Sequence, residues 1–497
     1  MSKKLMLVLA ALLCVSVCGC TADKAEKTEK PTDADTQTSE VTEVDETDDE
    51  EEDEAEDEEE VVIKDDNYYL SDLSTESYDG YDFRILIRPG KTPDQWLEED
   101  SDDPVQSAVY KRNKTVEDRY GITISATESS SSDYESDALN SILAGDDAYD
   151  IIFPHSRAAF TYAVQGAVYN INEIESIHLD KPWWSKDIYN SCNINGKLFV
   201  LDGDISMHRL EYAMCLCFNK RIFDELGYDY PYELVKDGEW TFDQFAYLVK
   251  KGGKDLNGDG VMTAEEDQFG YYATEWNGPI EILYTGGAKV YDKNDEGMLE
   301  LTLYSNKTVQ IFDSYFNLVD NDNVFMSNGA HRVSNFFSQG RAMFADSGLG
   351  SVKSLRDMDD DFGVVPYPKF TEEDEYATVV NGHAHLAVIP ITVSDVERTG
   401  AIIEALCAYG SRDVLPAFYD VSLKTKYARD NDSEEMMDII KDSIIYDIGY
   451  VAGGSFQSTG YDLANSATHD FASYYASRES SAQKALEKFN KDYGGIE

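Results

Sequence analysis

Short apolar runs alternate with segments of helical spacing between residues 83 and 153. The apolar runs have the length of buried strands, and Gly or Pro follows several of them. The intervening segments place apolar residues three and four positions apart, as an amphipathic helix requires. We therefore expect strands at 83–87, 122–126 and 149–153, with helices around 105–120 and 139–144. This β-α-β-α-β order predicts an α/β fold with a mostly parallel sheet.

Polar residues follow the third of these strands. His155, Ser156 and Arg157 come directly after Pro154. In open parallel sheets, ligands bind outside the carboxyl ends of the strands. The position therefore makes these residues candidate ligand contacts, His155 above all, and ordinary polar loop residues are the alternative.

The first twenty residues carry an export signal. Lys3 and Lys4 precede an apolar run over residues 5–17, which is too short to span a bilayer as a mature helix. The run ends in Val-Cys-Gly-Cys, which resembles a bacterial lipobox. We expect a signal peptide over residues 1–19 and lipidation of Cys20 on the extracellular or periplasmic side of the cell membrane. An ordinary signal peptide is the alternative.

Acidic residues dominate the segment that follows. The chain has a formal net charge of -55, and residues 43–60 are almost unbroken Asp and Glu. Such a segment cannot bury enough apolar surface to offset its ordering entropy, so we expect residues 20–66 to be a disordered stalk. Residues 23–66 can reach at most about 145 Å, at about 3.3 Å each. A solubilising tail without a required length is the alternative. The acidic charge also argues against nucleic acid as a partner.

One loop has the pattern of a calcium site. Oxygen ligands recur at positions 1, 3, 5, 9 and 12 of the twelve-residue segment 255–266, a glycine stands at position 6, and a backbone carbonyl is available at position 7. The predicted ligands are Asp255, Asn257, Asp259, Val261, Thr263 and Glu266. A helix is expected before the loop, but a turn and strand are expected after it, so we expect a structural ion rather than a sensor. An acidic turn without metal is the alternative.

Signatures of catalysis and metal binding are otherwise scarce. No phosphate-binding loop, dinucleotide motif or nucleophile elbow occurs. His383 and His385 would share one face of a strand, as a metal pair requires, but the adjacent Asn381-Gly382 and the apolar residues 386–389 favour an ordinary strand start. Pairs of carboxylates for glycoside cleavage remain open in so acidic a chain. Cys192, Cys215, Cys217 and Cys407 have no zinc-site spacing, and we expect buried free thiols rather than disulfides.

Aromatic residues in polar loops are candidate sugar contacts. Trp183 and Trp184 follow Pro182, Trp276 precedes Asn-Gly-Pro, and Tyr284 stands shortly before Gly286. Aromatic rings stack on the apolar faces of sugars while neighbouring polar groups bond the hydroxyls. Packing beneath the loops is the alternative.

Several segments in a fixed order resemble one family, the extracellular solute-binding proteins of carbohydrate ABC transporters, in the maltose-binding-like group. The resemblance covers about residues 67–497. It is carried by the lipobox at Cys20 and by residues 149–153, 195–199, 217–227, 240–245, 255–270, 339–343 and 362–369.

The resemblance implies a two-lobe periplasmic-binding-protein-like fold of type II, with ligand enclosed between the lobes. Lobe 1 would comprise about 67–214 plus 362–395, and lobe 2 about 215–361 plus 396–497. The hinge crossings would lie near 215–219, near 363–366 and after Pro390. The cleft would include Trp183, Trp184, Asp204, Trp276, Ser347 and Gly348.

The function that the resemblance implies is capture of a sugar or oligosaccharide by a monomeric, non-enzymatic receptor. The receptor would deliver its ligand to ABC transporter permease subunits. A carbohydrate-acting surface enzyme is one alternative. A receptor or adhesin for a non-sugar solute such as a peptide is the other.

Overall fold

The computed structural model describes residues 64–91, 94–129, 131–327, 336–427 and 430–495. The signal peptide, Cys20 and nearly all of the predicted stalk lie outside these residues. Residues 63–497 form one compact unit. None of the helices in the described ranges combines the length and the apolar character needed to cross a membrane.

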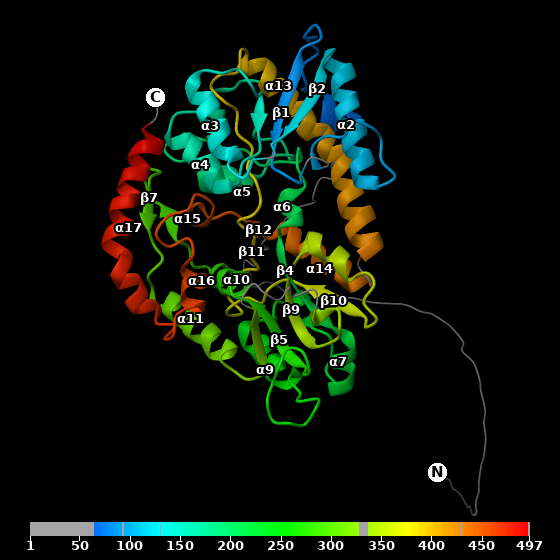
Figure 1. Cartoon of the computed structure of the whole chain (residues 1–497), viewed down its shortest axis with the longest axis vertical. Coiled ribbons are helices and arrows are strands. Elements are labelled where there is room, and N and C mark those ends of the chain that lie inside the picture. Colours follow the sequence, from blue (N-terminus) through cyan, green and yellow to red (C-terminus); the bar gives the residue numbers. More distant parts are fainter. Residues whose placement is uncertain (1–63, 92–93, 130, 328–335, 428–429, 496–497) are drawn as a thin grey trace, which may run out of the picture. The chain divides into compact units, whose positions relative to one another are not determined.

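The first sheet is built from the N-terminal strands. β1 (Asp82–Ile87) lies between β2 (Thr123–Glu128) and β3 (Ile151–Ile152), and all three strands are parallel. The crossovers are α2 (Pro104–Tyr120) and α3 (Tyr134–Ala144), which lie beside the sheet in Figure 1. The predicted β-α-β-α-β order is confirmed. Residues 385–390 extend this sheet through antiparallel bridges, among them the one between Ile152 and Val388.

Local sequence explains where α2 begins and ends. The Asp103 carboxylate accepts hydrogen bonds from the first free backbone N–H groups of the helix, and Pro104 stands at its first position. Gly121 ends the helix with a left-handed φ of 63°, which glycine adopts without steric cost.

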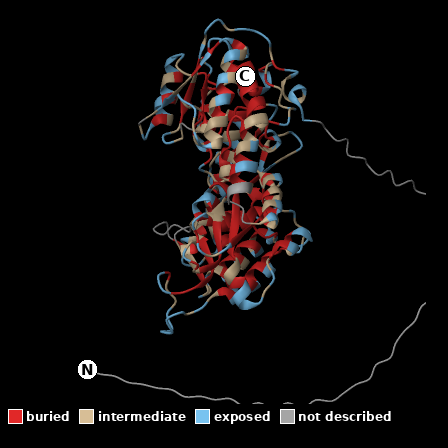
Figure 2. Cartoon of the chain, turned by 90° about the vertical axis from the view of Figure 1, so that its right-hand side faces the viewer, coloured by how far each residue is buried: buried red, intermediate tan, exposed pale blue. Residues whose placement is uncertain are grey.

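The second sheet has five strands in the order β10-β4-β9-β5-β8. They are β4 (Met214–Asn219), β5 (Phe269–Thr274), β8 (Val324–Ser327), β9 (Ala342–Gly348) and β10 (Phe362–Val365). β5 runs parallel to both β9 and β8, whereas β4 is antiparallel to its two neighbours. Every residue of β4 is buried, and Figure 2 shows that the buried residues concentrate in the sheet strands. A mixed sheet with helices on its faces accounts for the continuous apolar run of this strand.

The remaining elements surround and connect the two sheets. They are α1 (Asp66–Leu70), α4 (Ser156–Val164), η2 (Ile171–Glu173), α5 (Lys186–Cys192), α6 (His208–Glu211), α7 (Lys220–Leu226), α8 (Tyr232–Lys236), α9 (Phe242–Gly252), α10 (Asn277–Thr285), β6 (Tyr291–Lys293), β7 (Leu299–Leu301), α11 (Asn306–Val319), η3 (Leu349–Leu355), β11 (Thr378–Val379), α13 (Val396–Tyr409), η4 (Gly410–Val414), η5 (Ala417–Tyr427), α14 (Asn431–Asp442), β12 (Ile444–Ile445), α15 (Ile448–Val451), α16 (Thr459–Ala464) and α17 (Phe471–Gly494).

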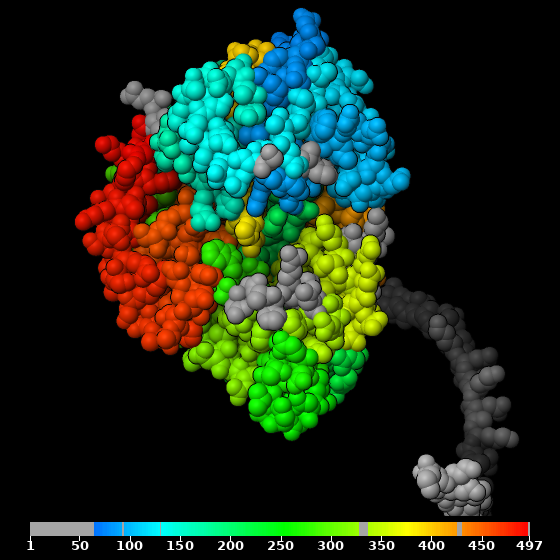
Figure 3. Space-filling view, viewed as in Figure 1, coloured from blue at the N-terminus to red at the C-terminus, as the bar shows by residue number. Residues whose placement is uncertain are grey.

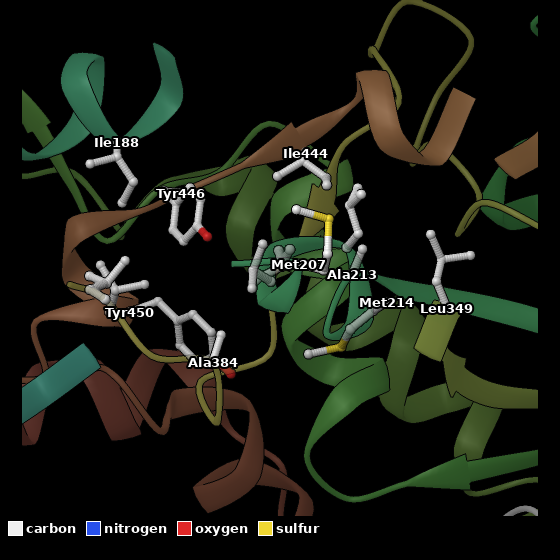
Figure 4. Packing of buried hydrophobic residues seen from close by; sticks show 14 of the residues in the cluster. Ile188, Met207, Ala213, Met214, Leu349, Ala384, Ile444, Tyr446 and Tyr450 are labelled. Atoms are coloured by element: carbon white, nitrogen blue, oxygen red, sulfur yellow. The ribbon is translucent and has the colours of Figure 1, made fainter. Parts of the chain in front are cut away.

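The chain crosses between the sheets at two adjacent segments. Ala213 bridges to Val380 in antiparallel fashion, and the Asn381 N–H donates to the Tyr212 carbonyl at 2.9 Å. Buried side chains from several elements pack at this junction, and Figure 4 shows Met207, Met214, Leu349, Ile444 and Tyr446 among them.

Two parts of the expected lobe assignment differ from this arrangement. Phe362–Val365 was expected in lobe 1, but β10 pairs with β4 in the second sheet. Val396–Tyr409 was expected in lobe 2, but α13 packs against α2 beside the first sheet. Strand pairing and helix docking are contacts between residues far apart in sequence, so a resemblance in chain order could not assign them.

The elements around the first sheet are called the first region and those around the second sheet the second region, and the C-terminal helix α17 contacts both. The Tyr493 hydroxyl donates to the Cys192 carbonyl at 3.0 Å, and its ring packs 4.9 Å from that of Phe199. At the other end of the helix, the ring of Phe471 packs 5.0 Å from that of Phe312. The four cysteines of the described region are buried and free, as predicted.

A buried carboxyl group near the junction makes stability depend on pH. Asp202 accepts a hydrogen bond from the Tyr446 hydroxyl at 3.0 Å, and burial raises the pKa of Asp202 to about 6. Since the pKa is lower in the unfolded chain, the folded protein binds more protons between about pH 4 and pH 6. The contribution of Asp202 to stability therefore increases as the pH falls from 7 to 5.

We expect Asp202→Asn to reduce this pH dependence. The amide carries no charge to desolvate, so the variant should be more stable than the wild type at pH 7.5, by at most about 3 kcal/mol for a shift of about two pKa units. Denaturant unfolding at pH 5.0 and pH 7.5 measures the difference. Asp118→Asn, on the exposed face of α2, is the control. Parallel pH profiles for wild type and Asp202→Asn would contradict the assignment.

Candidate ligand-binding site

A cavity of ≈ 590 Å³ lies against the second sheet and the crossing segments. A neighbouring cavity of ≈ 340 Å³ shares part of its lining, so the two form one cleft. The shared residues are Asn277, Ser347, Gly348, Gly350, Ser351, Lys353, Asn381 and His383. In Figure 3, the face shown carries the blue and cyan segments of the first sheet above the green and yellow segments of the second.

The carboxyl ends of parallel strands form one wall of the cleft. Ser347 and Gly348 end β9, residues 274–276 end or follow β5, and Ser327 ends β8. These ends meet at one edge because β5 is parallel to both neighbours. The half-buried Ser347 and Gly348 line the cleft where the resemblance expected them.

Asp346 is a buried carboxylate in this wall. It accepts hydrogen bonds from the Tyr367 hydroxyl at 2.5 Å, from the N–H and hydroxyl of Thr274 at 2.7 and 2.9 Å, and from the Tyr271 hydroxyl. Burial raises its pKa, although these donors oppose the shift. The network ties the end of β5 to β9 and so holds the wall in place.

Trp276 lines the cavity as a half-buried side chain. Its indole N–H donates to the Tyr450 hydroxyl at 3.2 Å, and its ring packs 5.0 Å from that of Tyr461. Beside it, the Asn381 amide donates to the Asn277 side-chain oxygen at 3.1 Å. An oriented ring and two neighbouring amides therefore face the same cavity. Sequence reasoning noted Trp276 but did not assign Asn277 or Asn381 to the site.

Charged side chains connect the two sides of the cleft. Lys91 follows β1 and lies 3.3 Å from the Glu211 carboxylate, and Lys353 in η3 lies 4.0 Å from the same carboxylate. Burial lowers the pKa of Lys91, but Glu211 and Asp94 raise it to about 12. Lys91 therefore stays charged, and Glu211 is shared between cations of both regions.

One group of possible metal ligands lies next to these ion pairs. Among the described residues, Asp94, His208 and Glu211 place one ligand atom each within 4.8 Å of one another. The Lys91 ammonium lies 3.4 Å from Asp94 and 3.3 Å from Glu211, so both carboxylates already have a cationic partner. The donor set therefore suits an ion-pair network better than a cation site.

Trp183 and Trp184 do not reach the cleft. Both side chains are buried, at 1% and 3% exposure, and their indole N–H groups donate to the Glu404 carboxylate at 3.0 and 2.9 Å. Glu404 belongs to α13, so the two rings attach that helix to the first region. The alternative of packing beneath a loop is the correct one for this pair.

Asp204 and Tyr284 also lie away from the cleft. Asp204 is buried and pairs with Arg209 at 2.6 Å. Tyr284 is buried in α10 and lines a different cavity, of ≈ 230 Å³, beside Asp447. Because both have internal partners, neither is available to a ligand in the cleft.

The predicted calcium loop folds as a tight turn between α9 and β5, as expected. The Asn257 amide donates to Asp259 at 3.2 Å and to Glu266 at 2.9 Å, so three predicted ligand side chains meet. Asp255 accepts backbone N–H groups of Gly258 and Gly260, and both glycines have φ near 80°. Thr263 instead turns toward Asp267, which accepts its N–H at 2.8 Å. Carboxylate oxygens on a tight turn are the type of donor that a hard cation prefers.

His155 lies on the other side of the cleft, beside a cavity of ≈ 500 Å³. Its ring centroid is 6.0 Å from that of His383, which lines the main cavity. The sequence analysis interpreted His383 as an ordinary strand start. The Asn381-Gly382 turn directly before it was the available signal for a loop position at the cavity.

Comparison with known proteins agrees with this fold. An ABC transporter solute-binding protein from Thermotoga lettingae, bound with alpha-D-tagatose, has a TM-score of 0.54 at 15% identity, covering 82% of this chain and 100% of that chain. The GacH receptor of Streptomyces glaucescens, also solved in complex with acarbose, has a TM-score of 0.53 at 12% identity, covering 83% and 99%. UgpB from Mycobacterium tuberculosis, in complex with glycerophosphocholine, has a TM-score of 0.52 at 16% identity, covering 83% and 99%.

These likenesses identify the type II periplasmic-binding-protein-like fold that the sequence predicted. No curated protein sequence matches the chain. The family model described as bacterial extracellular solute-binding protein matches residues 111–408, which is more than half of the chain. The protein therefore belongs to the bacterial extracellular solute-binding protein family.

Proposed function

We propose that this protein captures a carbohydrate in the cleft and delivers it to the permease subunits of an ABC transporter. The observation that carries the proposal is the combination of the oriented Trp276 ring with Asn277, Asn381 and Ser347 in one cavity. A sugar offers an apolar face to a ring and hydroxyls to amides and hydroxyls, so this lining suits it. Two of the similar structures hold a sugar or a sugar analogue, which supports the same class of ligand.

Capture would proceed by movement of the two regions about the paired crossing segments. A ligand shifts an open–closed equilibrium only through contacts that differ between the two states. Contacts to Trp276 on one side and His383 on the other would exist together only around an enclosed ligand. The ion pairs of Glu211 with Lys91 and Lys353 would favour the closed arrangement.

We further propose that the receptor acts as a monomer held at the membrane by a lipid on Cys20. The supporting observations are the short apolar run, its small residues and the cysteine that ends it. An anchor would raise the concentration of loaded receptor near the permease. Cys20→Ser should release the protein from membranes into the soluble fraction, which fractionation after labelling with a fatty acid measures. Continued labelling of the variant would contradict the site.

The carbohydrate proposal predicts that Trp276→Ala weakens sugar binding by more than about 1 kcal/mol, the loss that marks the few residues carrying most of a binding energy. A thermal-shift screen of sugars, peptides and amines identifies the ligand, and calorimetry then compares variants. Trp96→Ala is the matched control, because that half-buried ring lines neither cavity of the cleft and donates to the Ile124 carbonyl. Unchanged affinity in Trp276→Ala, or recovery of a chemically altered sugar, would count against the proposal.

We also propose that the loop over residues 255–266 binds a structural calcium ion. The meeting of Asn257, Asp259 and Glu266 supports it, together with the two glycines that form the turn. Calcium would reduce the repulsion between the carboxylates and hold β5 to α9. The loop precedes β5, whereas the cleft lies at the other end of that strand. The ion would therefore act on stability rather than on ligand specificity.

Chelation should lower the melting temperature without abolishing the fold. Calcium at 100 times its Kd would add about 2.7 kcal/mol to the stability of the folded chain. Glu266→Gln should remove the calcium-dependent rise in melting temperature. Glu265→Gln, the neighbouring exposed acid that is not a predicted ligand, is the matched control. Equal responses of the two variants to calcium would contradict the assignment.

A further inference from the structure

The first sheet presents its own strand ends to the cleft. β1, β2 and β3 are parallel, so the residues that follow them meet at one edge. Arg88 follows β1, and His155 and Arg157 follow β3. These residues line the cavity of ≈ 500 Å³ together with Ser131, Ser132, Tyr134 and Glu135.

Two guanidinium groups at this edge have no carboxylate within ion-pair distance among the described residues. Arg88 donates to the His383 carbonyl at 2.7 Å, and the exposed Arg157 side chain has no hydrogen-bond or ion-pair partner in the described ranges. By contrast, Arg84, which lies within β1, pairs with both Asp147 and Asp150. Acidic residues are abundant in a chain with a net charge of -55. Two arginines that line the same cavity without an acidic partner in the part of the chain that the structure describes therefore require an explanation.

The positive charge of this edge comes from the two guanidinium groups and not from the neighbouring histidines. Burial, with the charges of Arg157 and Arg88, lowers the pKa of His155 to about 4, and the pKa of His383 falls for the same reasons. The one carboxylate of the cavity lining, Glu135, accepts the His155 N–H at 2.7 Å and the Tyr134 hydroxyl at 3.1 Å. The Glu135 carboxylate thus accepts from donors of the cavity wall. Its single negative charge stands against the two positive charges of Arg88 and Arg157.

This edge borders the ligand cleft at His383, although the cavities on the two sides share no lining residue. The rings of His155 and His383 are 6.0 Å apart, and Arg88 bonds the backbone of His383. A ligand stacked on Trp276 could therefore extend toward Arg88 and Arg157. The N-terminus of the nine-residue α4, which carries Arg157 in its first turn, adds partial positive charge in the same place.

We infer that the solute is an acidic carbohydrate whose carboxylate or phosphate binds between Arg88 and Arg157. The inference rests on the proposed carbohydrate function and specifies its substrate class. Guanidinium groups bind either anion through paired N–H donors, so uronic acids and sugar phosphates share the chemistry that this edge recognises. Ser131 and Ser132 offer hydroxyls to the same anion.

Matched neutral and acidic sugars test the inference on the full folded receptor. Calorimetry would compare glucose, glucuronate and glucose 6-phosphate, and galactose with galacturonate, at fixed ionic strength. The acidic member of a pair should bind about 10–100-fold more tightly, the range of hydrogen bonds to charged groups. A preference for the uronates identifies a carboxylate ligand, and a preference for glucose 6-phosphate identifies a phosphate ligand.

Arg157→Gln is the decisive variant, because its side chain has no internal partner whose loss would disturb the fold. It should remove the preference for the acidic sugar and leave the affinity for the neutral one within about twofold. Arg88→Lys should weaken acidic sugars less, since the charge remains and the paired donors are lost. Arg478→Gln, on α17 and outside the lining of the cleft, is the control for loss of one positive charge.

The outcomes separate this inference from the proposed function. Binding of neutral sugars without preference for acidic ones, or an unchanged preference in Arg157→Gln, overturns the inference and leaves the carbohydrate receptor standing. Failure of every sugar to bind, with binding of peptides or amines, overturns both.

Discussion

The centre of the cleft depends on the backbone pairing where the chain crosses between the two sheets. Ala213 bridges to Val380, and Asn381 donates to Tyr212. This pairing sets Asn381 beside Asn277, and the Gly382 N–H donates to the Tyr450 hydroxyl that also holds Trp276. Backbone hydrogen bonds at a buried junction are costly to leave unmade, so the crossing orients the side chains of the cavity with little freedom.

Parallel strands give the cleft two similar walls. β5, β8 and β9 end at one wall, and β1, β2 and β3 end at the other. Loops at strand ends are free to vary because the sheet, not the loop, carries the core. The two walls nevertheless differ in chemistry. The second sheet presents Trp276 and Ser347, whereas the first presents Arg88 and Arg157.

Local cations work against the overall charge of the chain. The net charge of -55 repels an anionic solute at long range, but exposed charges are screened beyond roughly 8–10 Å in physiological salt. At the edge of the first sheet, Arg88 and Arg157 supply the local positive charge, because neither has a carboxylate within ion-pair distance among the described residues. An acidic surface is therefore compatible with a site for an anion, provided that the cations lie within the screening length of the ligand.

The aromatic residues illustrate how far local sequence can place a site. Trp183, Trp184 and Trp276 all stand in polar loops, and the sequence offers no means of separating them. Only Trp276 lines the cleft, because Glu404, more than two hundred residues away, accepts the indole N–H groups of the other two. Tyr284 is likewise buried by neighbours that are distant in sequence. The distinction lies in tertiary partners that a loop's own composition does not encode.

The sequence by itself determined the order of strands and helices, the helix ends at Asp103 and Gly121, the glycine turns of the 255–266 loop and the burial of the cysteines. These features follow from periodicity and backbone preference within a few residues. Tertiary structure alone decided that β10 joins the second sheet, that α13 packs on the first region, and that Arg88 and Arg157 meet beside the cleft. Those outcomes depend on contacts between segments far apart in the chain, whose energies no local pattern contains.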